Sequence, residues 1–274
     1  MQLNDTSTQA GAIRPLRCVW LLCKLKLTHQ MNFRFSFFGG FFVDGTMFLL
    51  QLLAFNAIYG ATGGIGGWSQ GEMILFLGTG SLINALNMVL YFFGVNTLPD
   101  KILSGSLDLY LSKPVSPLLR VTFENVDLGS LPLVGLSVLI LLYGASLLPA
   151  PVAPGTVLLY VLFVLLMTLL WYDLEVIVRT LPFYFLTAGG AQDLEGSLLE
   201  LCLKVPGVWF QGFFKILFYF VLPYGVMMTL PTQVLAGTLE PVGMLFGAGI
   251  VALFTALTAL CWKLGLRHYK SPGN

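Results

Sequence analysis

The chain has 274 residues, of which 57% are hydrophobic and 10% are charged, and its formal net charge is +1. Soluble domains carry about 25% charged residues, so the composition excludes an ordinary water-soluble domain, and the near-zero net charge gives no indication of a nucleic-acid partner. It predicts an all-α integral membrane protein that has the lipid bilayer as its surroundings. Apolar runs such as residues 157–170 are long and lack the two-residue alternation of a membrane β-barrel.

The chain begins with an arm, residues 1–34, that is too charged to cross a bilayer. Within the arm, residues 15–30 combine Leu, Val and Trp with the basic Arg17, Lys24 and Lys26. Such a helix lies in the membrane interface with its basic side chains at anionic headgroups, or it is a soluble cytoplasmic helix. We expect the interfacial amphipathic helix.

Six apolar stretches follow, each long enough to cross a bilayer as a helix. The predicted spans are residues 36–59, 72–95, 121–148, 156–180, 208–231 and 242–262. Lys and Arg are confined to the arm, to two of the connecting loops with their flanks, and to the tail. The positive-inside rule therefore places both termini in the cytoplasm. The sequence predicts one six-helix transmembrane domain, residues 35–262, with a cytoplasmic loop at 97–120 and a cytoplasmic tail at 263–274.

Polar side chains mark the first two spans. Asp44 and Gln51 lie one heptad apart, and Asn84 and Asn87 share one helical stripe. Amide and small side chains let membrane helices approach and form hydrogen bonds with one another. These four residues either pack helices within the subunit or line a translocation path or dimer seam, and the sequence leaves both alternatives open.

The loop LPDKILSGSLDLYLSKPVSPLLR (98–120) is more polar than its surroundings and contains several helix-breaking residues. Gly105 ends one short helix, a second turn ends before Pro114, and Ser116-Pro117 begins the next helix. The pattern predicts a rigid helix–break–helix element, and this much punctuation favours a docking element over an ordinary connecting loop. Its expected key residues are Gly105, Leu107, Asp108, Tyr110, Leu111, Lys113 and Pro114.

The fourth span carries two charged residues, Glu175 and Arg179, spaced to pair on one helix face. Charges inside a membrane are costly and indicate function by default. Their place near the end of the span favours instead an intrahelix salt bridge at the cytoplasmic boundary, which we predict here.

Several enzyme motifs are absent from the sequence. It contains no G-x-x-x-x-G-K-[ST], H-E-x-x-H or G-x-S-x-G, and no cluster of Cys and His. A membrane hydrolase or metalloprotease would therefore lack the residues it needs, and we expect a chain that is not itself an enzyme, with no catalytic, cofactor-binding or metal site of its own.

The segment ILSGSLDLYLSKPVSPL (102–118) resembles the signature cytoplasmic loop of ABC-2-type permeases. The tail at 262–274 and the segment VLPYGVMMTLPTQVL (221–235) also resemble the branch described as ABC-2 family transporter proteins, some of which are linked to drug export. Six spans with both ends inside match this family. One departure is Pro-Phe-Tyr-Phe at 182–185, where related chains tend to carry a Phe-Trp pair.

The resemblance implies the membrane subunit of a bacterial exporter in the cytoplasmic membrane, with an amphipathic, drug-like or lipid-like substrate. It implies a second permease, in a homodimer or a heterodimer, and separate cytoplasmic ATPase subunits that bind ATP and Mg. The N-terminal helix and the loop 97–120 would touch the ATPase. Asp108 either meets a basic residue of the ATPase or caps its own turn. The contacts expected in that loop are Leu107, Asp108, Tyr110 and Lys113.

Two other classes of protein compete with this interpretation. An ion-coupled secondary carrier needs ionisable residues deep in the membrane, for which Asp44 is the clearest candidate. A membrane-embedded lipid-modifying enzyme needs a nucleophile with its base, or a metal site, and the sequence shows neither constellation.

Overall fold

The structure is a computed structural model that describes residues 21, 24, 34–62, 66–185 and 189–269. Within these residues every regular element is a helix, which confirms the all-α prediction. The expected interfacial helix at 15–30 lies almost wholly outside the described residues, so it stays a prediction.

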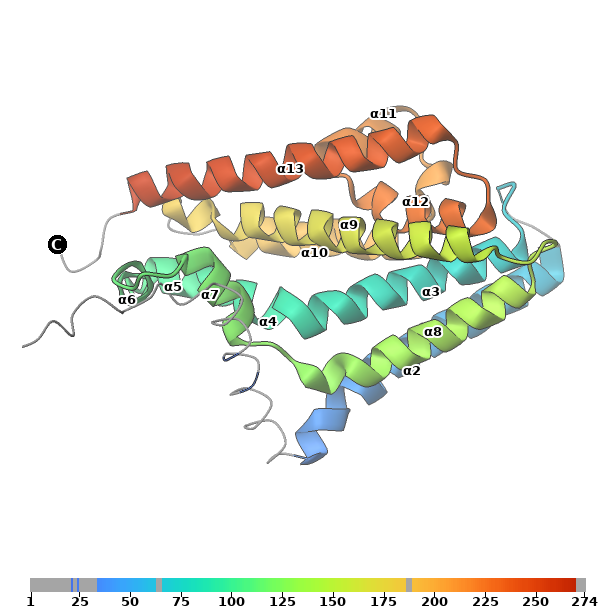
Figure 1. Cartoon of the computed structure of the whole chain (residues 1–274), viewed down its shortest axis with the longest axis horizontal. Helices are drawn as coiled ribbons and strands as arrows, with labels where there is room; N and C mark the ends of the chain where they lie inside the picture. The colour runs from blue at the N-terminus through green and yellow to red at the C-terminus, as the bar shows by residue number, and fades with distance from the viewer. Residues whose placement is uncertain (1–20, 22–23, 25–33, 63–65, 186–188, 270–274) are drawn as a thin grey trace, which may run out of the picture.

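Five long helices form the body of the molecule. They run side by side along its long axis, with α3 and α9 in the middle (Figure 1). The long helices are α2 (Arg34–Thr62), α3 (Gln70–Asn87), α8 (Leu131–Ser146), α9 (Pro154–Arg179) and α13 (Pro241–His268). A π-helical turn, η1 (Met88–Phe92), and α4 (Phe93–Val95) continue α3 toward α5 (Leu98–Leu103).

Four helical segments in the described part of the chain are long and apolar enough to cross a membrane. They are Gln70–Leu103, Leu128–Ser146, Pro154–Phe183 and Pro241–His268, and a bent pair gives up to five. The first predicted span corresponds to α2, in which Gly45–Tyr59 forms a shorter apolar stretch. The chain is therefore a multi-pass membrane protein, whereas the predicted number of six spans is not confirmed.

The predicted fifth span is broken in the structure. Its two halves, Gly212–Val221 and Tyr224–Ala236 (α12), meet at an angle of 85°. Pro223 lies at the break, where it has no N–H to continue the ladder of helical hydrogen bonds. The fifth span predicted at 208–231 therefore corresponds to a bent pair of helices and not to one straight helix.

The predicted third span begins later than expected. The helix α7 (Pro117–Glu124) ends at Asn125, and a 3₁₀ turn, η2 (Leu128–Ser130), precedes α8. The Asp127 side chain accepts a hydrogen bond from the Gly129 N–H at 3.2 Å and so caps this turn. The break separates α7 from the apolar helix that follows it.

The helix α10 (Gly189–Lys204) lies where the sequence predicted a cytoplasmic loop. It packs against α3, α9 and α12, and Figure 1 shows it running along α9. Gln51, in the apolar stretch of α2, donates a hydrogen bond to the Leu203 carbonyl oxygen at 3.4 Å. The chain thus re-enters the body of the molecule after α9.

Small and hydroxyl-bearing side chains bring the long helices together. A Cβ atom on Gly144 of α8 would lie 3.0 Å from the backbone nitrogen of Leu75 in α3. Between the same helices, the Ser81 and Ser137 hydroxyls are 2.7 Å apart. Close packing and interhelical hydrogen bonds hold membrane helices together, because the lipid is as apolar as their side chains.

Candidate functional site

The predicted helix–break–helix loop is present in the structure. We call residues 98–124 the α5–α7 element: it comprises α5, α6 (Asp108–Leu111) and α7. Gly105 separates α5 from α6 with φ of 77°, a left-handed conformation that glycine adopts without strain. The Leu107 N–H then donates to the Lys101 carbonyl oxygen at 3.1 Å, which closes the end of α5. The breaks are as expected, and Leu107 precedes α6.

The α5–α7 element has a hydrophobic core of its own. This core joins the element to η3 (Leu181–Phe183), which follows α9, and to the end of α13. The Phe183 ring lies 5.7 Å from the Trp262 ring and 5.9 Å from the Tyr269 ring. The buried residues of this cluster are Leu98, Ile102, Leu107, Val121 and Phe183.

Polar contacts tie the three short helices to one another. Glu124 in α7 forms an ion pair with Lys101 of α5 at 2.6 Å and accepts a hydrogen bond from the Tyr110 hydroxyl of α6 at 2.8 Å. The Arg120 guanidinium lies over the Tyr110 ring, 4.6 Å from its centre. Burial, together with Glu124 as hydrogen-bond acceptor and negative charge, raises the pKa of Tyr110 to about 12. The element is therefore one rigid unit.

Two of the four expected contact residues point inward. Leu107 is completely buried and Tyr110 is half-buried against Glu124, so both hold the element together. Leu109, which sequence reasoning did not single out, is 67% exposed. Leu107 and Tyr110, which were expected to contact the ATPase, therefore belong to the core of the element. The apolar side chains that project outward are Leu103, Leu109 and Leu111.

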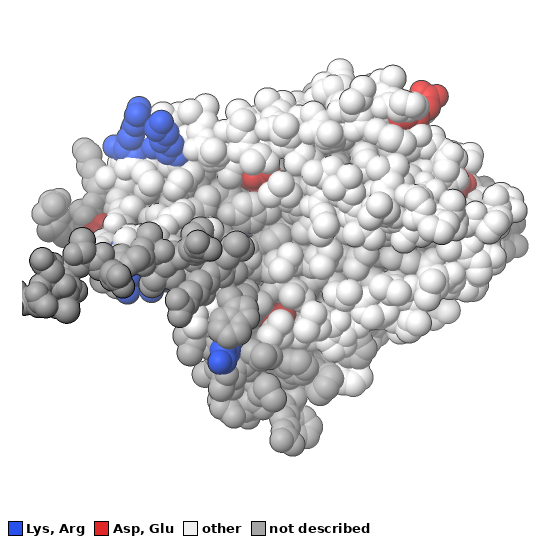
Figure 2. Space-filling view, in the orientation of Figure 1, with Lys and Arg blue, Asp and Glu red and all other residues white. Residues whose placement is uncertain are grey.

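The polar residues of the loop lie on its surface. Asp108, Lys113 and Pro114 are exposed. Asp108 lies near the end of α13, where burial and then the Asp108 carboxylate raise the pKa of Tyr269. Figure 2 shows Lys and Arg side chains over the end of the molecule where α13 ends and the α5–α7 element lies.

The predicted Glu175–Arg179 pair is not formed. Arg179 makes its ion pair with Glu195 of α10, and its Nε donates to the Asn96 side-chain oxygen at 3.1 Å. The Tyr224 hydroxyl of α12 donates to the other carboxylate oxygen of Glu195 at 3.1 Å. The helix α10 thus supplies a partner for Arg179 that the sequence, read as a loop there, did not reveal.

Glu175 instead contacts neutral side chains. Its Oε1 accepts hydrogen bonds from the Asn87 amide at 3.3 Å and from the Trp171 indole N–H at 3.1 Å. Asn87 is 1% exposed and Glu175 is 3% exposed. Asn87 therefore lies inside the subunit and does not line an open path.

The other expected path residues are dispersed. Gln51 contacts the backbone of α10, as described above, and Asn84 is half-buried with its amide 4.0 Å from the Met88 sulfur. The Asp44 side chain lies outside the part that the structure describes. Gln51, Asn84 and Asn87 therefore each contact a different partner, and a role of these residues in a translocation path or dimer seam stays a prediction.

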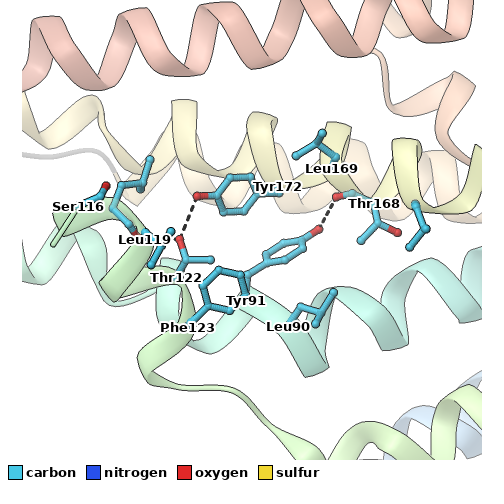
Figure 3. A pocket seen from close by; sticks show the side chains of 11 residues that line it. Leu90, Tyr91, Ser116, Leu119, Thr122, Phe123, Thr168, Leu169 and Tyr172 are labelled. Atoms are coloured by element: carbon cyan, nitrogen blue, oxygen red, sulfur yellow. Dashed lines mark hydrogen bonds between the residues drawn. The ribbon is translucent and has the colours of Figure 1, made fainter. Parts of the chain in front are cut away.

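A cavity that the sequence did not predict lies between η1, α7 and α9 (Figure 3). Its volume is about 370 Å³ and its walls are largely apolar. Hydroxyl groups cross it: Tyr91 donates to the Thr168 carbonyl oxygen at 2.8 Å, and the Thr122 and Tyr172 hydroxyls are 2.9 Å apart. The lining residues are Leu90, Tyr91, Ser116, Leu118, Leu119, Thr122, Phe123, Leu165, Thr168, Leu169 and Tyr172.

The described residues do not group His, Cys, Asp and Glu side chains in a way that would hold a metal ion. The rigid α5–α7 element lies at one end of the spans. A charged network of Arg179 and Glu195 joins α9 to α10. The cavity lies between η1, α7 and α9.

A family model described as ABC-2 family transporter protein matches residues 46–273. The match includes the α5–α7 element, the charged network and the cavity. It confirms the resemblance carried by the loop 102–118 and the tail. Searches of curated proteins and of solved structures found no match.

Proposed function

The chain belongs to the ABC-2 transporter family, and from this premise we propose that it is the permease subunit of an ABC exporter. In this proposal separate cytoplasmic ATPase subunits bind ATP and Mg and hydrolyse the ATP. A second permease, the same chain or a homologue, completes the transporter in the bacterial cytoplasmic membrane.

The α5–α7 element is the observation that carries the proposal. A docking site needs a rigid short element with apolar and charged side chains that project outward. The element is fixed by its own core and by the Lys101–Glu124 ion pair, while Leu109, Asp108 and Lys113 are exposed. A rigid core beneath exposed apolar and charged side chains favours a docking surface that can pass the movement of a bound ATPase to the spans without changing its own shape.

The connections of the element to the spans suggest how force would pass onward. Residues Gln70–Leu103 form one continuous span from α3 to α5, so a push on α5 acts along α3. The break at Asn125–Asp127 separates α7 from α8. We infer that the α5–α7 element moves together with α3, and with α8, which packs closely on α3, relative to the part of α9 that lines the cavity. Such a movement would change the shape of the cavity between η1, α7 and α9.

The cavity supports an amphipathic substrate. Its walls are largely apolar, and five of its eleven lining residues carry a hydroxyl group. Mainly apolar walls with a few placed polar groups are typical of sites that bind small amphipathic molecules. We propose that a drug-like or lipid-like molecule enters the permease here.

Reconstitution tests the proposal. The chain is coexpressed with a candidate ABC ATPase from the same genome and placed in liposomes, and ATP-dependent movement of a fluorescent amphipathic dye is measured. We expect transport only with the chain, the ATPase and ATP together. Transport by the chain alone under a proton or sodium gradient would show an ion-coupled carrier and contradict the proposal.

A docking variant sharpens the test. Leu109→Ala removes an exposed side chain of α6, and Leu158→Ala removes a 74% exposed side chain of α9 as the matched control. We expect Leu109→Ala to lower recovery of the tagged ATPase and Leu158→Ala to leave it unchanged. Equal recovery with both variants would count against docking at α6.

A further inference from the structure

Two buried oxygen atoms, on side chains that contact each other, have no hydrogen-bond partner among the described residues. One is Oε2 of Glu175 in α9, and the other is Oδ1 of Asn87 in α3. The same two side chains are already joined by the bond from the Asn87 amide nitrogen to Glu175 Oε1 at 3.3 Å. Buried oxygens normally have hydrogen-bond partners, so this pair requires an explanation.

An ionised Glu175 would be poorly compensated. The nearest cation, Arg179, makes its ion pair with Glu195, so two buried carboxylates share one guanidinium. A buried charge without a partner of its own is costly, and a buried acceptor without a hydrogen bond adds to that cost. Both penalties fall on the same side chain.

One proton removes both penalties. A carboxylic acid and a primary amide form a cyclic pair in which the amide N–H donates to one carboxyl oxygen and the acid O–H donates to the amide oxygen. The first of these bonds is the observed one, and the two unpartnered oxygens are the atoms that the second would join. Protonation of Oε2 therefore neutralises Glu175 and satisfies Asn87.

We propose that Glu175 is a proton-binding site, held as a neutral acid paired with Asn87 while α10 keeps Arg179 on Glu195. The inference rests on side-chain geometry and does not depend on the proposed function.

Other occupants fit the site less well. A metal cation takes about six or more oxygen ligands, whereas two unpartnered oxygens are available here. A bridging water would donate to both oxygens but would leave the carboxylate charge in place.

Arg179 and Glu195 link the protonation of Glu175 to the position of α10. Arg179 lies one helical turn after Glu175, on the same face of α9, and is withheld from it by Glu195. If α10 moved away, Arg179 would be free to pair with Glu175, which would then release its proton. Binding of the proton and packing of α10 therefore stabilise each other.

Among the residues that the structure describes, the other ionisable groups near Glu175 bring no second cation. Tyr91 of η1 donates to the Thr168 backbone, and Tyr224 of α12 donates to Glu195. Asp173 accepts a hydrogen bond from Thr255 of α13 at 2.6 Å. Arg179 is thus the cation that would exchange with the proton.

Infrared difference spectroscopy on the whole chain in nanodiscs tests the site. Glu175→Gln is the neutral isostere, whose amide can still donate to Asn87, and Asp193→Asn on the exposed face of α10 is the matched control. The wild-type minus Glu175→Gln spectrum at neutral pH should contain the C=O band of a protonated acid, shifted in D₂O. The band should persist in Asp193→Asn. Carboxylate bands in that difference spectrum would overturn the proposal.

The link to α10 has its own test. In Glu195→Gln, Arg179 loses its ionised partner and becomes free to pair with Glu175. We therefore expect the acid band of Glu175 to disappear at neutral pH, measured on the monodisperse fraction of the purified variant. Persistence of the band would overturn the link.

Stability provides an independent readout. At a pH above the ordinary titration range of glutamic acid, the unfolded chain has released the Glu175 proton and the folded chain still holds it. In this pH range the folded-to-unfolded ratio should fall about tenfold per pH unit, until the folded site also loses its proton. Glu175→Gln should remove this slope. An equal slope in the variant would contradict a proton on Glu175.

Discussion

Replacing Gly94 with alanine tests whether the α5–α7 element is packed rigidly onto the spans. Gly94 lies in α4, directly against the backbone of α7. A Cβ atom at this position would be 2.3 Å from the Val121 carbonyl oxygen and 2.5 Å from the Thr122 carbonyl oxygen. Both are backbone atoms, so a side-chain rotation cannot relieve the contact.

The cost follows from the displacement required. Non-bonded contacts involving carbon are most favourable at about 3.5–4.0 Å, so α7 must move by roughly 1 Å. Overpacking of this kind costs about 1–3 kcal/mol, and the rigid backbone places Gly94→Ala near the upper end. At about 2–4 °C per kcal/mol, the melting temperature should fall by roughly 4–12 °C.

Thermal unfolding in nanodiscs measures the effect, and coupled ATPase activity reports whether force still passes through the element. Gly135→Ala in α8 is the matched control, because its Cβ would meet no atom within 4 Å. We expect the control to be neutral or more stable by about 0.4–1 kcal/mol. If Gly94→Ala melted at the same temperature as wild type and Gly135→Ala, the close packing of α4 on α7 would be refuted.

Two further predictions concern the α5–α7 element, and a third concerns the contact between α3 and α8. Leu107→Ala should destabilise the chain by about 2–5 kcal/mol because Leu107 is completely buried, whereas Leu109→Ala should leave melting unchanged; equal melting of the two variants would contradict the assignment of core and surface. Tyr110 is protonated in the folded chain up to a pKa of about 12, against about 10 when unfolded, so stability should fall between about pH 10 and 12 in wild type and less steeply in Tyr110→Phe; identical pH profiles would show that Tyr110 does not contribute. Ser137→Ala should cost about 0.6 kcal/mol through loss of the Ser81 contact, as measured by thermal unfolding against the neighbouring Ser146→Ala; a larger loss in the control would contradict this role.

The sequence was sufficient for the features that depend on local rules. Apolar runs predicted membrane helices, and glycine and proline positions predicted the breaks of the α5–α7 element, including the one at Gly105, where the structure shows a left-handed backbone. These features follow from the chemistry of the backbone, which each short segment carries within itself.

The region after α9 shows where local rules fail. Arg179 and Lys204 led to the prediction of a cytoplasmic loop at 179–204, because the positive-inside rule counts cations by position. Arg179 is in fact neutralised by Glu195, and Lys204 pairs with Glu200 at 2.5 Å. Arg179 is buried in its ion pair and does not indicate a solvated loop, and its partner becomes visible only when α10 is placed beside α9. The Lys204–Glu200 pair, by contrast, lies within α10 and is exposed.

The inward and outward faces of α6 could not be assigned from its sequence. Leu107, Leu109 and Leu111 are all apolar within one turn, and the helix is too short for a periodic pattern to distinguish them. Packing against Phe183 and Val121, which come from other parts of the chain, selects Leu107 as the buried residue. The cavity has the same origin, because its walls come from segments around residues 90, 120 and 170.

Site-specific photo-crosslinking tests the central proposal most directly, namely that this chain is a permease moved by an ATPase docked on the α5–α7 element. A photoreactive residue is placed at position 109 in α6, and at position 158 in α9 as a control, in membranes that contain the coexpressed ATPase. The account predicts a crosslink to the ATPase from position 109 and none from position 158. Absence of a crosslink at 109, or equal crosslinking at both positions, would contradict it.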